Sequence, residues 1–93
     1  MKLTKRERSA MMDEITEHMC EYTDPEDLKR ELQEIWKFGT SFPPLARRTD
    51  DELIQAFADE FNADDPTDLV DVLQMTTTKT KARKIAKQFY KEH

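Results

Sequence analysis

Apolar residues recur every three or four positions along most of the chain, which places them on one face of an α-helix. Residues typical of helix starts and helix ends divide this pattern into separate segments. We predict helices over residues 5–22, 25–38, 49–62, 66–74 and 79–91. The expected fold class is all-α, a compact bundle of about five short helices with a helical hairpin at 5–38 and a three-helix unit at 50–91.

Signals for helix starts stand at the head of four of these segments. They are two T-x-x-E capping boxes and two Asp-Pro pairs: Thr4 with Glu7, Thr49 with Glu52, Asp24-Pro25 and Asp65-Pro66. Gly39 should end the second helix in the left-handed conformation, and Asn62 should cap the end of the third. These capping residues predict where each helix begins or ends.

Each predicted helix carries an apolar face. The expected members, in chain order, are Met12, Ile15, Met19 and Tyr22; Leu28, Leu32, Ile35 and Trp36; Leu53, Ile54, Phe57 and Phe61; Leu69, Val70, Val72 and Leu73; and Ala82, Ile85, Ala86 and Phe89. Residues 40–48 form the one real loop, in which Pro43-Pro44 opposes helix. Phe42 and Leu45 should fold back onto the core.

Composition narrows the class of protein. The 93 residues suit a single domain over 1–93, and 38% of them are charged against 37% apolar. An all-helical fold suits such a low apolar fraction, because each helix needs only a narrow apolar stripe facing the core. No apolar run is long enough for a membrane span, and Cys20 is the only cysteine, so we expect a cytoplasmic protein. With one glycine and no catalytic cluster, we expect no enzyme and no cofactor.

The charges are unevenly distributed. Residues 49–78 carry nine acids and no Lys or Arg, whereas both ends of the chain are basic. An acidic helical face can dock on a basic partner, and the residues we expect to do so are Asp51, Glu52, Asp59 and Glu60. The same acids could instead imitate a phosphate backbone. In the simplest interpretation they are a solvated surface, with acids placed favourably at helix starts.

The last helix offers a second surface, with Lys79, Lys81, Arg83, Lys84 and Lys87. The segment from Leu69 to the Thr76–Thr78 run resembles the L-A-x-x-L-G-V-S stretch of helix-turn-helix bacterial regulators, with Gln74 where that motif prefers Gly. The resemblance implies that the last helix enters a DNA major groove, as part of a two-fold dimer. Its basic face could be extended by Lys5, Arg6, Arg8, Arg47 and Arg48. Alternatively, the basic helix neutralises the acidic helices within the fold.

Two groups of residues resemble metal sites in part. Glu60, Asn62, Asp64, Asp68 and Asp71 follow a calcium-loop register, but Asp65 stands where the loop needs Gly. Glu14, His18 and Glu21 share a face of the first helix, without a second group of ligands to complete a transition-metal site. We therefore predict no metal site.

Methionines are numerous for so small a chain. Met11, Met12, Met19 and Met75 could line an adaptable binding surface or simply fill the core. By exclusion, we expect a small non-enzymatic protein-interaction or regulatory module of bacterial or phage type, binding a protein partner through an acidic or apolar helical face. The alternative is a helix-turn-helix-like DNA-binding protein that uses the basic C-terminal helix.

Overall fold

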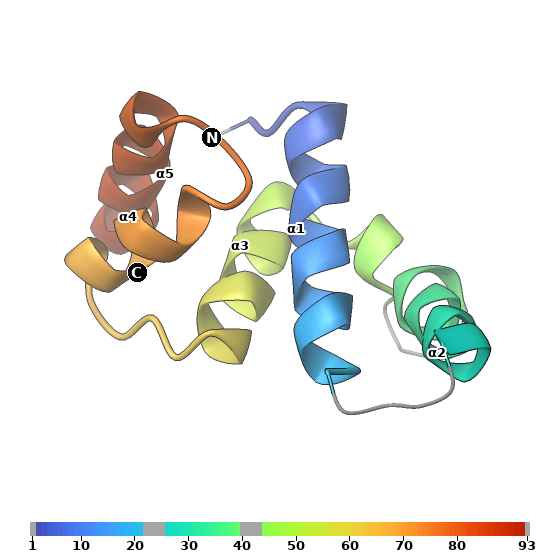
Figure 1. The fold of residues 1–93 in the computed structure, drawn as a ribbon. Coiled ribbons are helices and arrows are strands. Elements are labelled where there is room, and N and C mark those ends of the chain that lie inside the picture. Colours follow the sequence, from blue (N-terminus) through green and yellow to red (C-terminus); the bar gives the residue numbers. More distant parts are fainter. Residues whose placement is uncertain (1, 22–25, 40–43, 93) are drawn as a thin grey trace.

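The computed structural model describes residues 2–21, 26–39 and 44–92, and this part of the chain is all-α, as predicted (Figure 1). Its elements are α1 (Lys5–Met19), α2 (Glu26–Phe38), the 3₁₀ turn η1 (Leu45–Arg47), α3 (Asp50–Glu60), α4 (Pro66–Leu73) and α5 (Lys79–Glu92). No strand occurs within those residues. No described helix is both long enough and apolar enough to cross a bilayer.

The predicted capping residues start three of the helices. Both capping boxes form. The hydroxyls of Thr4 and Thr49 accept a hydrogen bond from the backbone N–H three residues on, and the backbone N–H of each threonine donates to the carboxylate of Glu7 or Glu52. Asp65 caps α4, with its Oδ1 2.8 Å from the N–H of Asp68. The Asp24-Pro25 pair lies outside the described residues. Local sequence therefore determines these starts, since each cap satisfies an otherwise unpaired N–H.

The two expected helix ends differ. Asn62 has a φ of 53°, the left-handed conformation expected after α3, where Asn is tolerated better than most residues. Gly39 does follow the last residue of α2, as predicted, but the left-handed conformation expected for it is wrong, because no glycine of the described chain has a positive φ. The N–H of Gly39 instead continues the helical pattern by donating to the carbonyl of Ile35 at 2.9 Å.

The hydrophobic core is built from α1, η1, α3, α4 and α5. Its buried members are Leu3, Met11, Ile15, Leu45, Leu53, Ile54, Phe57, Ala58, Ala63, Leu69, Leu73, Ala82, Ile85, Ala86 and Phe89. The inward faces predicted for the last three helices are thus confirmed in large part, and so is Leu45, whereas Phe42 lies outside the described residues. No residue of α2 is buried.

In space, α4 packs against α5, while α1 packs against α3 on one side and α2 on the other (Figure 1). The N-terminal segment and the first turn of α1 contact both the start of α3 and the turn before α5. The Leu3 N–H and the Arg8 guanidinium both donate to Asp50, at 2.9 and 2.6 Å. The Thr77 hydroxyl donates to Glu7 at 2.7 Å. Helix α1 therefore joins the α3 side of the molecule to the start of α5.

Helix α2 meets α1 through polar side chains. Lys29 pairs with Glu17 and Lys37 with Asp13, each at 2.5 Å. Because higher numbers on α2 meet lower numbers on α1, the two helices run antiparallel, as a hairpin requires. The apolar face predicted for α2 is consequently left largely exposed, with Leu28 at 43%.

Candidate protein-binding groove

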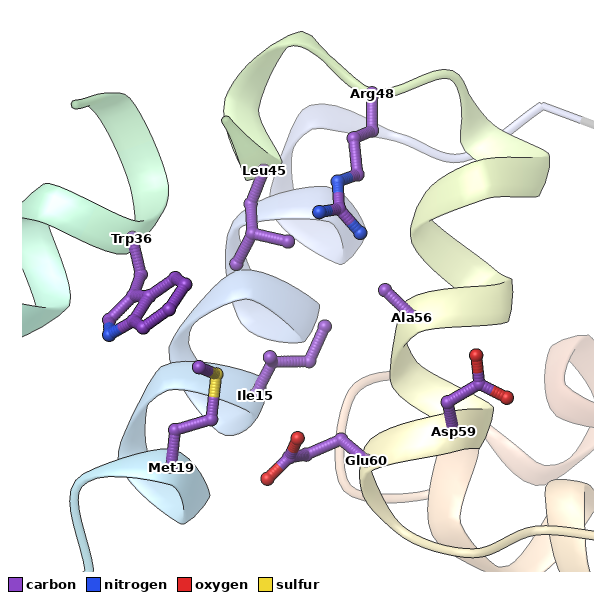
Figure 2. A pocket seen from close by; sticks show the side chains of 8 residues that line it. All are labelled: Ile15, Met19, Trp36, Leu45, Arg48, Ala56, Asp59 and Glu60. Atoms are coloured by element: carbon purple, nitrogen blue, oxygen red, sulfur yellow. The ribbon is translucent and has the colours of Figure 1, made fainter. Parts of the chain in front are cut away.

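A groove of about 280 Å³ lies between α1, α2 and α3. It is lined by Ile15, Met19, Trp36, Leu45, Arg48, Ala56, Asp59 and Glu60. Helix α1 forms the floor, with Ile15 and Met19 directed into the space, while α2 and α3 form the walls and η1 closes one end (Figure 2). Helix α2 contacts η1 as well as α1, and the groove lies where α2 and α3 leave a strip of α1 between them.

The walls of the groove differ in chemistry. Trp36 stands on the α2 wall, and the carboxylates of Asp59 and Glu60 stand on the α3 wall and near the floor (Figure 2). Trp36 and Met19 are each 39% exposed, whereas Ile15 and Leu45 are almost fully buried beneath them. An apolar floor with a few convergent charged groups is typical of a binding site.

Both rim carboxylates are held by neighbouring side chains. His18 of α1 contacts Glu60, with Nδ1 2.8 Å from Oε1, and its ring also lies 4.7 Å from that of Phe61. The amide of Gln55 donates to Asp59 at 2.8 Å. These contacts restrict the side chains, so less rotamer entropy would be lost when a partner binds.

The four acids predicted for a docking face therefore lie at two separate places on α3. Asp59 and Glu60 reach the groove, but Asp51 and Glu52 lie in the first turn of α3, about 10–13 Å away along the helix at 1.5 Å per residue. The Glu52 carboxylate accepts a hydrogen bond from Thr49 N–H, which lowers its pKa. Glu52 is thus engaged in capping the helix.

Four of the five predicted basic residues share one broad face of α5. Lys79, Arg83 and Lys87 follow one another at intervals of four and make one exposed row, and the exposed Lys84 lies beside it, three residues from Lys87. Lys81 turns toward the N-terminal segment, where its Nζ lies 3.9 Å from Glu7 and 3.3 Å from the carbonyl of Lys2.

Direct ion pairs do not carry the predicted neutralisation of α3 and α4 by α5. Among the described residues, no ion pair joins a base of α5 to an acid of either helix; its one ion-paired base, Lys81, meets Glu7 of α1. The reason is geometric, because α5 faces α4 through apolar residues such as Ile85 and Leu73, while its bases point to solvent.

The basic clusters outside α5 gather near the start of α1. Arg8 donates to the carbonyl of Arg48 at 2.6 Å, so the segment of Arg47 and Arg48 lies beside the first turns of α1. Lys81 of α5 reaches the same region, where its ammonium group donates to the carbonyl of Lys2. This end of the molecule is therefore surrounded by bases, although Asp50 and Glu7 lie among them.

Residues of the two predicted metal-site candidates do not form a cluster of metal ligands in the described structure. Within residues 2–21, 26–39 and 44–92, no three His, Cys, Asp or Glu side chains are grouped so that they could hold a metal ion. Of the calcium-loop positions, Glu60 contacts His18 and Asn62 adopts the left-handed helix-end conformation. The intervening Asp65 caps α4.

Sequence reasoning did not find the groove as a site. It named Asp59, Glu60 and Met19 separately, but assigned Trp36 to an ordinary apolar face. A signal was present, because Lys29, Gln33 and Lys37 recur every four residues and mark a polar face of α2 that meets α1. The methionines likewise have different roles: Met11 is fully buried, whereas Met19 and Met75 are exposed by 39% and 47%.

Comparison with protein-family models, with curated proteins and with solved structures found no match to this chain.

Proposed function

We propose that this protein is a non-enzymatic protein-interaction module of regulatory type, and that the groove between α1, α2 and α3 is its contact surface. The observation that carries the proposal is the half-exposed pair Trp36 and Met19 facing the carboxylates of Asp59 and Glu60. A partner would insert an apolar side chain over Ile15 and place a Lys or Arg beside the carboxylates. Aromatic side chains seated in such pockets contribute disproportionately to affinity.

The size of the groove limits what it can accept. A volume of about 280 Å³ is at the lower end for a small-molecule site and suits one or two side chains of a protein partner. Asp59 and Glu60 favour a basic group of the partner on the α3 side, whereas Arg48 places the opposite charge at the η1 end (Figure 2). A cytoplasmic, bacterial or phage regulator would fit this behaviour, and the buried Cys20 is compatible with a reducing compartment.

Photo-crosslinking in the source cell tests the proposal. A photoreactive amino acid at position 19 should capture a specific protein, whereas the same residue at position 75, also exposed but outside the groove, should not. The adduct should be lost in the double variant Asp59→Lys/Glu60→Lys, because charge reversal repels a basic partner. Asp64→Lys/Asp71→Lys, which makes the same change of charge away from the groove, should leave it intact. Equal adducts from positions 19 and 75 would contradict the proposal.

A second candidate function, DNA binding, is favoured by one observation: bases of α5, of the N-terminal segment and of residues 47–48 surround the same end of α1. The segment resembling a helix-turn-helix does fold as α4, a turn and α5. In this alternative, Lys79, Lys81, Arg83, Lys84 and Lys87 would contact phosphates and base edges. We rank it second because Arg8 and Lys81 are already engaged by Asp50 and Glu7.

A further inference from the structure

Helix α2 turns its apolar strip to solvent, on a side of the helix different from the groove. Leu28, Ile35 and Phe38 are exposed by 43%, 39% and 64%, and with the half-buried Leu32 they follow the i, i+4, i+7, i+10 spacing of one continuous strip. Trp36 lies about 100° around the helix from Ile35 and faces the groove instead. We call Leu28, Leu32, Ile35 and Phe38 the α2 strip.

The strip cannot turn inward while the polar contacts of α2 hold. Lys29, Gln33 and Lys37 face α1, where they meet Glu17 and Asp13. The side chains of Lys29 and Lys37 are only 12% and 18% exposed. The structure therefore fixes two properties of α2 together: its lysines are directed to α1, and its large apolar residues are directed to solvent.

The charges beside the strip are acidic. Glu31 and Glu34 line a shallow depression of about 400 Å³ together with Ile35, Phe38 and Gly39. Asp27 continues the same border one to two turns earlier, by the helical period, and all three acids are exposed. The other border of the strip adjoins α1. Arg30 is also exposed, three residues from Asp27 and four from Glu34, on the far side of these acids from the strip by the helical period. The edge directly beside the strip thus carries the three carboxylates.

We propose that the α2 strip binds a basic amphipathic helix of a protein partner. Helix-in-groove recognition uses apolar anchors at i, i+3 or i+4 and i+7, the spacing that the strip presents. Lysines or arginines flanking the partner's apolar residues would face Asp27, Glu31 and Glu34. This site is separate from the groove and does not depend on the function proposed for it, so the two together would make the protein bivalent.

Charge disfavours two other occupants. In a two-fold antiparallel dimer of α2 helices, the acidic border of one copy would face the same border of the other, and like charges so placed repel. A parallel pair would bring the border against the edge that α1 already covers. Anionic membrane surfaces attract amphipathic helices rich in Lys and Arg, whereas this border is acidic.

The proposal is tested with synthetic peptides and the full chain. The probe is a fluorescent peptide of about 15 residues, enough to match α2 in length, with leucines on one face and lysines beside them. We expect a Kd on the order of 10–100 µM by anisotropy. An isomer with glutamates in place of the lysines, and a scrambled peptide of the same composition, should not bind.

Matched variants locate the binding. Ile35→Ser/Phe38→Ser should raise the Kd of the peptide at least about tenfold, because two apolar anchors are lost. Met75→Ser should leave the Kd unchanged. Glu31→Lys/Glu34→Lys should raise it, and Asp64→Lys/Asp71→Lys, with the same charge change elsewhere, should do so much less. Because both strip residues are exposed, the Ser variants should remain folded, which circular dichroism checks.

Several results would overturn the proposal. Probe binding unchanged in Ile35→Ser/Phe38→Ser would place it elsewhere, and loss only in Asp59→Lys/Glu60→Lys would assign it to the groove, leaving the proposed function standing. A dimer in sedimentation that Phe38→Ser dissociates would identify a second copy as the occupant. Binding to phosphatidylglycerol vesicles that Phe38→Ser abolishes would identify a lipid surface.

Discussion

The carboxylate of Asp50 joins three parts of the chain. It accepts hydrogen bonds from the Leu3 N–H and the Arg8 guanidinium, and Arg8 in turn donates to the carbonyl of Arg48. Burial raises the pKa of Asp50, but these hydrogen bonds and the charge of Arg8 outweigh it and lower the pKa below its ordinary value. The folded state therefore favours the ionised form of Asp50.

Glu7 is held in a similar way at the start of α1. Burial raises its pKa, but hydrogen bonds from Thr4 and Thr77 and the charge of Lys81 lower it further than burial raises it. Both carboxyls thus release protons more readily in the folded chain than in the unfolded one. Since the unfolded chain binds protons first as the pH falls, the stabilisation is present above the unfolded pKa values of about 4 and is lost below them.

We therefore predict acid-sensitive stability that depends on Asp50. Asp50→Asn should lower the free energy of unfolding at pH 7 by about 1–3 kcal/mol, because a charge-assisted network at the base of α3 is lost. Below about pH 4 the difference from the parent chain should shrink, since the parent's Asp50 becomes protonated too. Urea unfolding at several pH values measures both effects. A difference that stays constant down to pH 2 would mean that the Asp50 charge does not contribute.

At the scale of the element, helix starts were predictable and helix orientation was not. Thr4, Thr49 and Asp65 act on N–H groups within three residues, so a short stretch of sequence contains the whole interaction. The apolar face of α2 was equally visible, but periodicity cannot show whether another element covers it. The outcome depends on the contacts of Lys29 and Lys37 with α1, which join residues 12 and 24 positions apart.

The candidate site was harder to predict than the helices, for the same reason. Asp59 and Glu60 were named from sequence because charge is a local property. Their neighbours in the groove, Trp36 and Leu45, come from other elements and are brought beside them only by tertiary packing. A groove made by three helices has no sequence signature of its own.

Helix α2 should be the least protected of the five helices against hydrogen exchange. It buries no residue, whereas α3 buries Leu53, Ile54, Phe57 and Ala58. Local opening of α2 therefore costs little apolar burial, and its amides should exchange faster than those of α3 by at least about tenfold. Exchange followed by mass spectrometry or NMR measures this. Equal protection of both helices would show that α2 opens only with the whole domain, and would contradict this prediction.

At the scale of the molecule, acidic and basic residues occupy different regions. Asp59 and Glu60 of α3 line the groove together with Arg48, and Glu31 and Glu34 of α2 border the α2 strip. Bases lie around the start of α1. Although the net charge is −5, the basic end and the exposed row Lys79, Arg83 and Lys87 of α5 would attract a polyanion. Protein binding and DNA binding would therefore use different ends of the same chain, and each can be tested without disturbing the other.

The DNA-binding alternative has its own test. If the protein-interaction proposal is right, a labelled mixed-sequence duplex should bind weakly at about 50 mM salt and not at all by about 200 mM, because the net charge of −5 opposes binding. The row Lys79, Arg83 and Lys87 supplies the variant: neutralising all three to Gln should abolish any low-salt signal without affecting the crosslink from position 19. Sequence-specific binding that persists at about 200 mM salt and is lost in that variant would instead make DNA the principal ligand. The groove would then have to serve another partner, or none.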